Sequence, residues 1–217
     1  MLELYGHPFS SYTWKAQIAF HEKGIDYDLK VIEPDRPENG ETLQRHWPLG
    51  KFPVVVDGDE PVIESSIIIE WLDRRFPETR PLVPRDPDRA LAVRFMDRVF
   101  DNHVMTPMQA VVIEHILDAA KPDESRIARA GAALDAIYGW LEDKLDGAWG
   151  AGEDFTLADC AAAPSLFYAD WVRPIPEQCK RLRDYRARLL ARPSVARCVD
   201  AARPYRHLFP LGAPDRD

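Results

Sequence analysis

The hydrophobic residues of the first 76 positions are spaced as in a strand in some segments and as in a helix in others. Apolar residues two apart predict strands at residues 2–5 and at Tyr27–Val31. Between them the spacing predicts a helix over about Ser11–Lys23, which Gly24 ends. This β-α-β order predicts two parallel strands joined by a crossover helix.

A second group of elements follows residues 33–50, which the sequence predicts to be irregular. Val54–Asp57 is a β-branched run that ends in Asp57-Gly58, a strong hairpin signal, and it predicts pairing with a second strand at Pro61–Ile63. A helix is predicted over about Ser66–Phe76, before a proline. A parallel βαβ unit followed by a hairpin and a helix is the thioredoxin-like arrangement.

The remaining chain is predicted to be mainly helical and to form a second domain. Residues 77–88 hold four prolines and several charges, as a stiff interdomain linker does. The predicted helices are Arg89–Ala120, Glu124–Leu145, Phe155–Val172, Cys179–Leu190 and Ser194–Arg203. Pro107 should kink or interrupt the first helix, and the third is apolar enough to be central and buried. We therefore expect a thioredoxin-like α/β domain over 1–76, a linker over 77–88 and an all-α domain over 89–217.

Composition and charge limit the classes of function. The 217 residues are 46% hydrophobic, which is ample for a packed core, and the net charge of -8 argues against a nucleic-acid-binding face. No apolar run is long enough for a transmembrane helix, and no signal peptide is visible, so no membrane partner is expected. Cys160, Cys179 and Cys198 are odd in number and widely spaced, which favours a reduced, cytoplasmic chain without a metal site.

The junction between the first strand and the first helix is where thioredoxin-like domains carry their chemistry. Redox members have Cys-x-x-Cys there, whereas this chain has "HPFSSYTW" and no cysteine before Cys160, which excludes disulfide exchange by this domain. The hydroxyls of Ser10, Ser11 and Tyr12 remain. Either a serine only caps the helix, or its hydroxyl and the positive helix N-terminus stabilise the thiolate of a bound thiol.

Two further sites also have a structural and a functional interpretation. Pro53 begins a core strand although it has no N–H; the Phe52–Pro53 bond is either an ordinary trans bond or a cis bond that turns the backbone of Phe52 toward a ligand. Glu64 and Ser65 precede an apolar helix. Either Glu64 and Ser65 belong to the cap of this helix, or they bind an amino-acid group of a ligand. In the second case Ser65 binds the ligand's carboxylate and Glu64 lies near the ligand's ammonium.

Several of these motifs together resemble the glutathione S-transferase family. "GKFPVVVDGD", with "ESSIIIEWL" beginning five residues after Asp59, resembles the family's glutathione site. The resemblance extends to the "SSYTWKAQIAF" helix, the proline linker, the helical second half and "FTLADCAAA", in which Thr156 and Asp159 have capping-box spacing. The serine corner is similar to that of the zeta and theta classes, although the zeta class has cysteine where Tyr12 stands.

The resemblance implies a role for each residue of the glutathione site. Pro53 is expected to be cis, and the backbone N–H and C=O of Phe52 to pair with the cysteinyl part of glutathione. Glu64 and Ser65 correspond to positions that hold the γ-glutamyl end. Lys51 either reaches the glycyl carboxylate or is a solvated loop lysine.

The resemblance also implies a thiol-activating group. Ser10 is the expected activating hydroxyl, and Ser11 is the supporting donor or the helix cap. Tyr12 stays an alternative activator.

An electrophile site between the two domains is implied as well. Its candidates are His7, Tyr12, His103, Met105, Met108, Tyr168 and Trp171. Ordinary core packing is the competing explanation for the methionines and aromatic residues. The histidines are as readily explained as surface or hydrogen-bonded residues.

The function implied is that of a homodimeric glutathione transferase. It would use glutathione as cosubstrate and hold it as a thiolate that attacks a small hydrophobic electrophile, without a metal or redox cofactor. The same thiolate would serve a glutathione-dependent isomerase, dehalogenase or etherase. A non-catalytic binding or interaction protein of the same fold is the alternative from another class.

Overall fold

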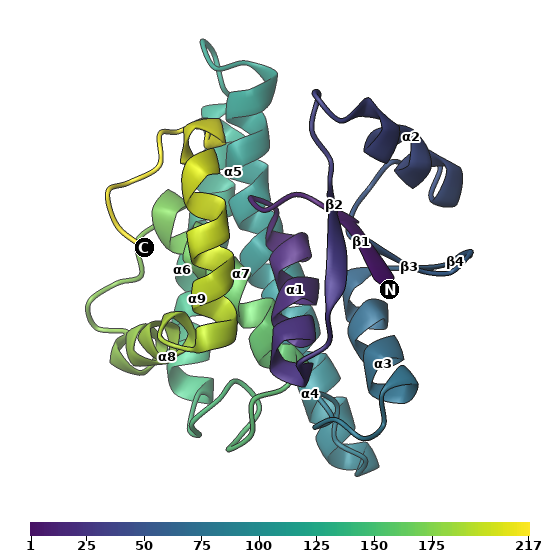
Figure 1. Cartoon of the computed structure of the whole chain (residues 1–217). Helices are drawn as coiled ribbons and strands as arrows, with labels where there is room; N and C mark the ends of the chain where they lie inside the picture. Colours follow the sequence, from purple (N-terminus) through teal and green to yellow (C-terminus); the bar gives the residue numbers. More distant parts are fainter.

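The computed structural model describes all 217 residues. Its N-terminal part contains one four-stranded sheet with the strand order β2-β1-β3-β4 (Figure 1). The strands are β1 (Leu2–Gly6), β2 (Tyr27–Val31), β3 (Val54–Asp57) and β4 (Glu60–Ile63). β1 and β2 are parallel, whereas β3 pairs antiparallel with both β1 and β4. With the crossover helix α1 (Ser11–Lys23) and the final helix α3 (Ser65–Arg75), this confirms the predicted thioredoxin-like arrangement.

Helices cover both faces of this sheet, and this explains why the β3 sequence is apolar without alternation. Val55 packs into the large core that contains α1 and α3. Val54 and Val56 point to the opposite face, where they pack with Tyr5 and with Leu43 of α2 (Pro37–His46). A strand that is buried on both faces needs apolar residues at consecutive positions.

Helix α2 corrects the prediction that residues 33–50 are irregular. The sequence "PENGETLQRH" is polar and contains glycine, so its intrinsic signal is weak. The helix begins with Pro37 in its first turn, and Leu43 is its one buried residue. The side-chain amide of Asn39 also donates to the carbonyl of Val31 at 2.8 Å. This segment is therefore helical because of its tertiary contacts with the sheet rather than because of its local sequence.

The C-terminal part is all helical, as predicted. Its elements are α4 (Pro87–Val99), the π-helical segment η1 (Phe100–Met105), α5 (Thr106–Leu117), α6 (Glu124–Lys144), α7 (Leu157–Val172), α8 (Lys180–Leu190), α9 (Pro193–Ala202) and the 3-10 segment η2 (Arg203–Leu208). Every residue of α7 from Leu157 to Trp171 is buried, which confirms that this helix is central. Thr156 and Asp159 form the predicted capping box, with the Thr156 N–H 2.8 Å from the Asp159 carboxylate. No helix has both the length and the apolar composition needed to cross a membrane.

The interruption expected near Pro107 takes the form of the π-helical segment η1. Pro107 itself lies at the start of α5, where the helix runs on from η1 with helical backbone angles at Met105 and Thr106, so Pro107 supplies no N–H to the preceding turn. A π-helical turn inserts an extra residue and changes which side chains face the core. Here it adjoins Arg98 and contains Asp101, which face the N-terminal part.

One hydrophobic core joins the two parts of the chain. It contains 45 buried residues, from Leu2 at one end of the sequence to Phe209 at the other. Helix α1 lies between the sheet and α7 (Figure 1), and the rings of Trp14 and Phe167 are 4.9 Å apart across that contact. Because α1 is packed on both sides, its N-terminus has a fixed position at the boundary between the two parts.

Candidate functional site

A cavity of about 360 Å³ lies at this boundary. The N-terminal part contributes the five residues of the predicted glutathione site, which are Lys51, Phe52, Pro53, Glu64 and Ser65, together with Tyr12, Trp47, Ile63 and Ser66. The helical part contributes Arg98, Asp101, Asn102 and Gln109. The structure thus brings the loop before β3, the start of α3 and one face of α4, η1 and α5 around a single space.

The loop before β3 exposes an unpaired stretch of backbone to the cavity. The Phe52–Pro53 peptide bond is cis, as the resemblance implied. Neither the N–H nor the C=O of Phe52 has a hydrogen-bond partner within the protein. An extended peptide lying beside Phe52 would find one donor and one acceptor, as at the edge of a sheet.

The start of α3 supplies a second set of free donors. The first hydrogen bond of this helix runs from the Ile68 N–H to the Glu64 C=O at 2.8 Å. The N–H groups of Ser65, Ser66 and Ile67 therefore have no helical acceptor. Together with the helix dipole they favour an anion at this end of the cavity.

Glu64 has a strained backbone at this position. Its φ is 72°, and it is the one residue other than glycine with a positive φ. Such a conformation costs about 1–3 kcal/mol and is typical of sites where the surrounding structure holds a residue in place. The carboxylate of Glu64 supplies negative charge beside the anion-favouring helix terminus, so this end of the cavity suits a group that carries both charges.

A buried network of charges lies directly behind the cavity. Lys15 of α1 is fully buried, and its Nζ lies 2.5 Å from Asp97, 2.7 Å from Asp101 and 2.8 Å from the hydroxyl of Ser66. Arg98 binds both carboxylates, with its Nη2 2.6 Å from Asp97 and 2.5 Å from Asp101. Two cations balance two carboxylates, and the network connects α1 and α3 with α4 and η1.

Sequence reasoning missed the helical wall of the cavity. Asp97 and Asp101 are four residues apart and so share one face of a predicted helix. Lys15 lies on α1 among residues that are otherwise mostly buried and apolar. These were the available signals, but only the three-dimensional structure shows that they meet.

The N-terminus of α1 places the three predicted hydroxyls differently. Ser10 is the helix cap, and its Oγ accepts from the Thr13 N–H at 3.3 Å. No acceptor within the protein takes the Ser10 hydroxyl proton, so capping leaves that proton free to be donated. Ser11 is buried and begins the helix, and neither serine lines the cavity, whereas Tyr12 does.

Three electrophile-site candidates gather around the loop that precedes Ser10. The Tyr168 hydroxyl donates to the Phe9 carbonyl at 2.9 Å, and the ring of Trp171 lies 6.4 Å from that of Phe9. The ring of His7 lies 4.6 Å from that of Tyr205 in the C-terminal segment. No motif in the sequence indicated Phe9 or Tyr205 as partners of these residues.

His7 is held as a neutral side chain. Burial lowers its pKa, and the Phe9 N–H donates to its Nδ1 at 3.0 Å. Because Nδ1 accepts this bond, the proton of the neutral ring lies on Nε2.

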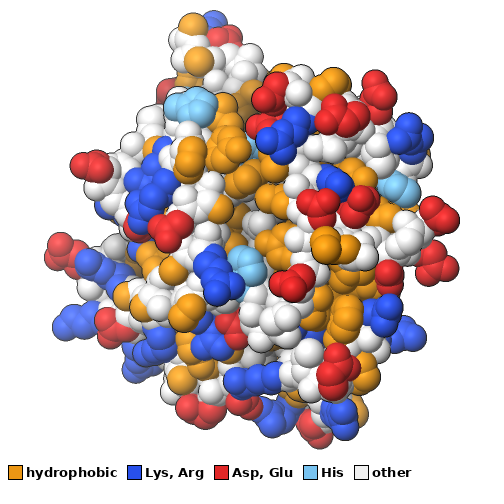
Figure 2. All heavy atoms as spheres, in the orientation of Figure 1, with side chains coloured by type: hydrophobic (Ala, Val, Ile, Leu, Met, Phe, Trp, Pro, Cys, Tyr) orange, Lys and Arg blue, Asp and Glu red, His pale blue; other side chains and the backbone are white.

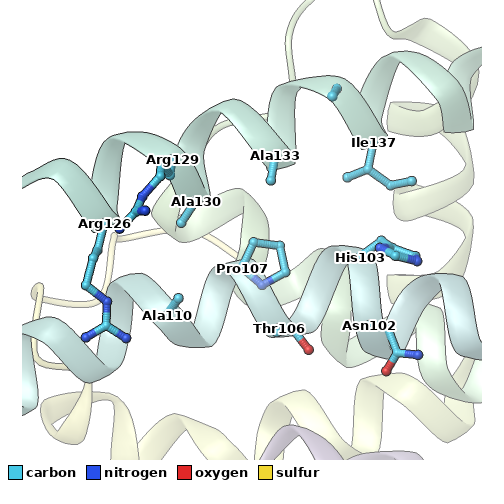
Figure 3. Close-up of a pocket in the computed structure, with 11 residues that line it drawn as sticks. Asn102, His103, Thr106, Pro107, Ala110, Arg126, Arg129, Ala130, Ala133 and Ile137 are labelled. Atoms are coloured by element: carbon cyan, nitrogen blue, oxygen red, sulfur yellow. The ribbon is translucent and has the colours of Figure 1, made fainter.

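The other three candidates lie elsewhere. Met105 and Met108 are 1% and 4% exposed in the hydrophobic core and line no part of the cavity, so core packing accounts for them. His103 lies in a separate, open groove of about 570 Å³ between α5 and α6. Figure 3 shows this groove with His103 and Asn102 at one end and Arg126 and Arg129 at the other.

The face of the molecule drawn in Figure 2 carries charges of both signs. In Figure 2 acidic and basic side chains are interspersed over the visible face, and hydrophobic side chains reach the surface between the helical part and the sheet. On this face the basic side chains form no continuous patch.

Comparison with known proteins gives the same assignment for both parts of the chain. Residues 4–80 match the family model "Glutathione S-transferase, N-terminal domain", and residues 124–188 match "Glutathione S-transferase, C-terminal domain". Glutathione S-transferase 1 of Dianthus caryophyllus is 31% identical over 171 residues, which is 76% of this chain and 76% of that protein. A stringent starvation protein A homolog of Coxiella burnetii is 28% identical over 77% of this chain and 75% of that protein.

A solved structure agrees with these relatives. The crystal structure of a glutathione S-transferase from Methylobacterium radiotolerans, in complex with glutathione sulfonate, is 31% identical with a TM-score of 0.77. The match covers 91% of this chain and 94% of that one. A thioredoxin-like domain followed by an all-helical domain, with a cavity between them, defines a two-domain class of thioredoxin-fold proteins. Within that class the chain belongs to the glutathione S-transferase family, whose cosubstrate is glutathione.

Replacing Lys15 tests the network behind the cavity. In Lys15→Met two buried carboxylates keep only Arg98 as a cation, so the free energy of unfolding should fall by about 3–5 kcal/mol at pH 7. The loss should shrink as the pH falls, because burial already raises the pKa of Asp101, and removing Lys15 removes a charge that favours its ionised form. Urea unfolding at pH 7 and pH 5 measures both effects.

Lys121 is an exposed loop lysine and provides the matched control, since Lys121→Met should change stability by less than about 0.5 kcal/mol. Equal stability of Lys15→Met and the wild type would show that the network contributes nothing.

Proposed function

We propose that this protein is a glutathione transferase that binds glutathione in the cavity, holds it as a thiolate and transfers it to a small hydrophobic electrophile. The observation that carries the proposal is the pairing, around one cavity, of the free backbone groups of Phe52 with the free N–H groups at the start of α3. Glutathione needs both, because it has an extended peptide core and a zwitterionic γ-glutamyl end.

Each part of glutathione has a complementary group. The cysteinyl backbone pairs with the N–H and C=O of Phe52, next to Pro53. The γ-glutamyl carboxylate accepts hydrogen bonds from Ser65 and the α3 N-terminus, and Glu64 balances the ammonium. Lys51, which lines the cavity, reaches the glycyl carboxylate.

Ser10 and the N-terminus of α1 stabilise the thiolate, with Ser11 as a supporting group. A free cysteine thiol titrates near about 8.5, so lowering its pKa by about two units makes most of it thiolate at about pH 7. Each unit corresponds to about 1.4 kcal/mol, which one or two charge-assisted hydrogen bonds supply. The Ser10 hydroxyl has the free proton that this role requires.

The electrophile binds beside the thiolate, near His7, Tyr168 and Trp171. In a substitution the sulfur forms a bond to the electrophilic carbon while the leaving group departs with its electron pair. In a conjugate addition the new carbanion takes a proton instead. Isomerisation, dehalogenation and ether cleavage begin with the same attack and differ in what the electrophile site accepts.

We also infer a homodimer in the cytoplasm. Four large apolar side chains on α3, α4 and α6 are between 38% and 66% exposed, namely Ile67, Leu91, Phe95 and Trp140. The rings of Phe95 and Trp140 lie 6.1 Å apart, and Arg94 of α4 forms an ion pair with Glu70 of α3. Such a patch is typical of a protein interface, and two copies related by a two-fold axis would cover it. All three cysteines are free and buried, which suits a reducing compartment.

The alternative is a protein that kept the fold and lost the chemistry. One relative is named as a starvation protein rather than a transferase. A purely structural role gives no reason for the free backbone groups at Phe52 and α3 to face one cavity with Glu64, and this favours catalysis.

Removing the Ser10 hydroxyl tests the thiolate step. Ser10→Ala should bind glutathione with nearly wild-type affinity, raise the pKa of the bound thiol by about two units and lower the rate at pH 6.5 about tenfold to a hundredfold. Calorimetry gives the affinity, and thiolate absorbance against pH gives the pKa.

Two variants control for the loss of the helix cap. Ser10→Gly keeps a good N-cap residue and should show the same pKa change, while Ser11→Ala should show a smaller one. If Ser11→Ala alone raises the thiol pKa, Ser11 is the activating residue. If the wild type does not lower the thiol pKa, the transferase proposal fails.

The dimer is tested at the apolar patch. Phe95→Glu should convert a wild-type dimer to a monomer in sedimentation equilibrium at micromolar concentration, because the charge is placed in the interface. Ile116 is 66% exposed at the far end of α5, so Ile116→Glu should leave the dimer intact. A monomeric wild type would contradict the inference.

A further inference from the structure

Tyr12 differs from most tyrosines of the chain in having no hydrogen-bond partner. Five of the seven tyrosine hydroxyls bond within the protein, namely those of Tyr5, Tyr27, Tyr138, Tyr168 and Tyr185. The hydroxyl of Tyr205, in the C-terminal segment, also has no hydrogen-bond partner, but the Tyr205 ring packs against the ring of His7. The half-buried Tyr12 lines the cavity instead. Its hydroxyl is not enclosed within the protein and is therefore open to a ligand in the cavity.

The hydroxyl of Tyr12 acts as a donor. Burial raises its pKa to about 12, and the carboxylates of Asp101 and Glu64 act in the same direction against Arg98. The phenol is therefore protonated at neutral pH and offers an O–H to the cavity.

The position of Tyr12 on α1 locates its side chain within the cavity. Tyr12 lies three residues before Lys15, so the two side chains share one face of the helix, and the Lys15 Nζ lies 2.8 Å from the Ser66 hydroxyl and 2.7 Å from Asp101. Asp101, Arg98 and Glu64 belong to the end formed by α3, η1 and α4, where the N–H groups of Ser65 and Ser66 are free. The Ser10 hydroxyl lies at the cap of α1 and outside the cavity lining. Tyr12 thus faces the zwitterion-binding end rather than the proposed thiolate position.

The donors at this end favour one acceptor. Ser65 and the α3 N-terminus attract an anionic group, and the phenol O–H adds a further donor of the same kind. Glu64 and Asp101 are the natural partners of an ammonium group and do not need Tyr12 for that purpose.

We propose that Tyr12 determines specificity for glutathione by donating a hydrogen bond to the α-carboxylate of the γ-glutamyl group. This inference rests on the proposed function. A site with such a donor binds a ligand that has the carboxylate and discriminates against one that lacks it, because the donor is then left unpaired in the cavity. Simple thiols without a γ-glutamyl carboxylate are accordingly poor ligands.

The test combines a change in the protein with a change in the ligand. Calorimetry would measure the Kd of the wild type and of Tyr12→Phe for glutathione and for γ-aminobutyryl-cysteinylglycine, which lacks only that carboxylate. Tyr12→Phe should weaken glutathione binding about tenfold and leave the binding of the analogue unchanged. The pKa of the bound thiol should not change. Tyr5→Phe, which removes a hydroxyl bonded to Glu3, is the matched control and should leave both affinities unchanged.

Other outcomes overturn the inference in distinguishable ways. Equal losses for both ligands would mean that Tyr12 serves general packing, and a raised thiol pKa would mean that it contacts the sulfur. An unchanged Kd for glutathione would exclude any binding role of the hydroxyl. Suppose that one of these outcomes occurs but the wild type binds glutathione and lowers the pKa of its thiol. Then only the role proposed for Tyr12 is wrong. If the wild type binds no glutathione, the proposed function falls with it.

Discussion

The ion pairs of Lys15 with Asp97 and Asp101 are the constraint on which the site depends. A fully buried lysine is tolerated only when carboxylates surround it, and both carboxylates come from the other part of the chain. Helix α1 is therefore fixed to α4 and η1 by charge as well as by the packing of Trp14 on Phe167. The N-terminus of α1 cannot shift without separating these charges.

This constraint places the two proposed ends of the glutathione site relative to each other. Lys15 is one helical turn from the serine corner, and it also binds the hydroxyl of Ser66 at the start of α3. The helix terminus proposed for the thiolate and the terminus proposed for the γ-glutamyl carboxylate are thus held by one side chain. Arg98 and Asp101 belong to the same network and form the cavity wall opposite them.

The sequence predicted the elements that have strong local signals. The strands, α1, α3 and the cis Phe52–Pro53 bond follow from periodicity, turn chemistry and the family resemblance. Helix α2 was not predicted because its sequence is polar and only Leu43 is buried. Long-range contacts determine that this segment is helical. The π-helical segment was not foreseen, although Pro107 indicated an interruption nearby.

The same difference between local signals and long-range contacts explains why only part of the candidate site could be predicted. Lys51, Phe52, Pro53, Glu64 and Ser65 lie on two neighbouring loops, and their motifs bring them to one cavity. The helical wall depends on how α4 and η1 pack against α1 and α3, which no short motif records. The sequence likewise could not show where the side chains of Tyr12, Met105 and Met108 point, since the direction of a side chain follows from tertiary packing.

A crystal structure of the protein with glutathione would test the central claim most directly. We expect density for an extended peptide whose backbone forms two hydrogen bonds of about 2.9 Å with the N–H and C=O of Phe52. The γ-glutamyl carboxylate should lie at the N-terminus of α3, with the sulfur beside Ser10. Glutathione bound in the groove between α5 and α6, or in the cavity with its γ-glutamyl group away from α3, would contradict the account.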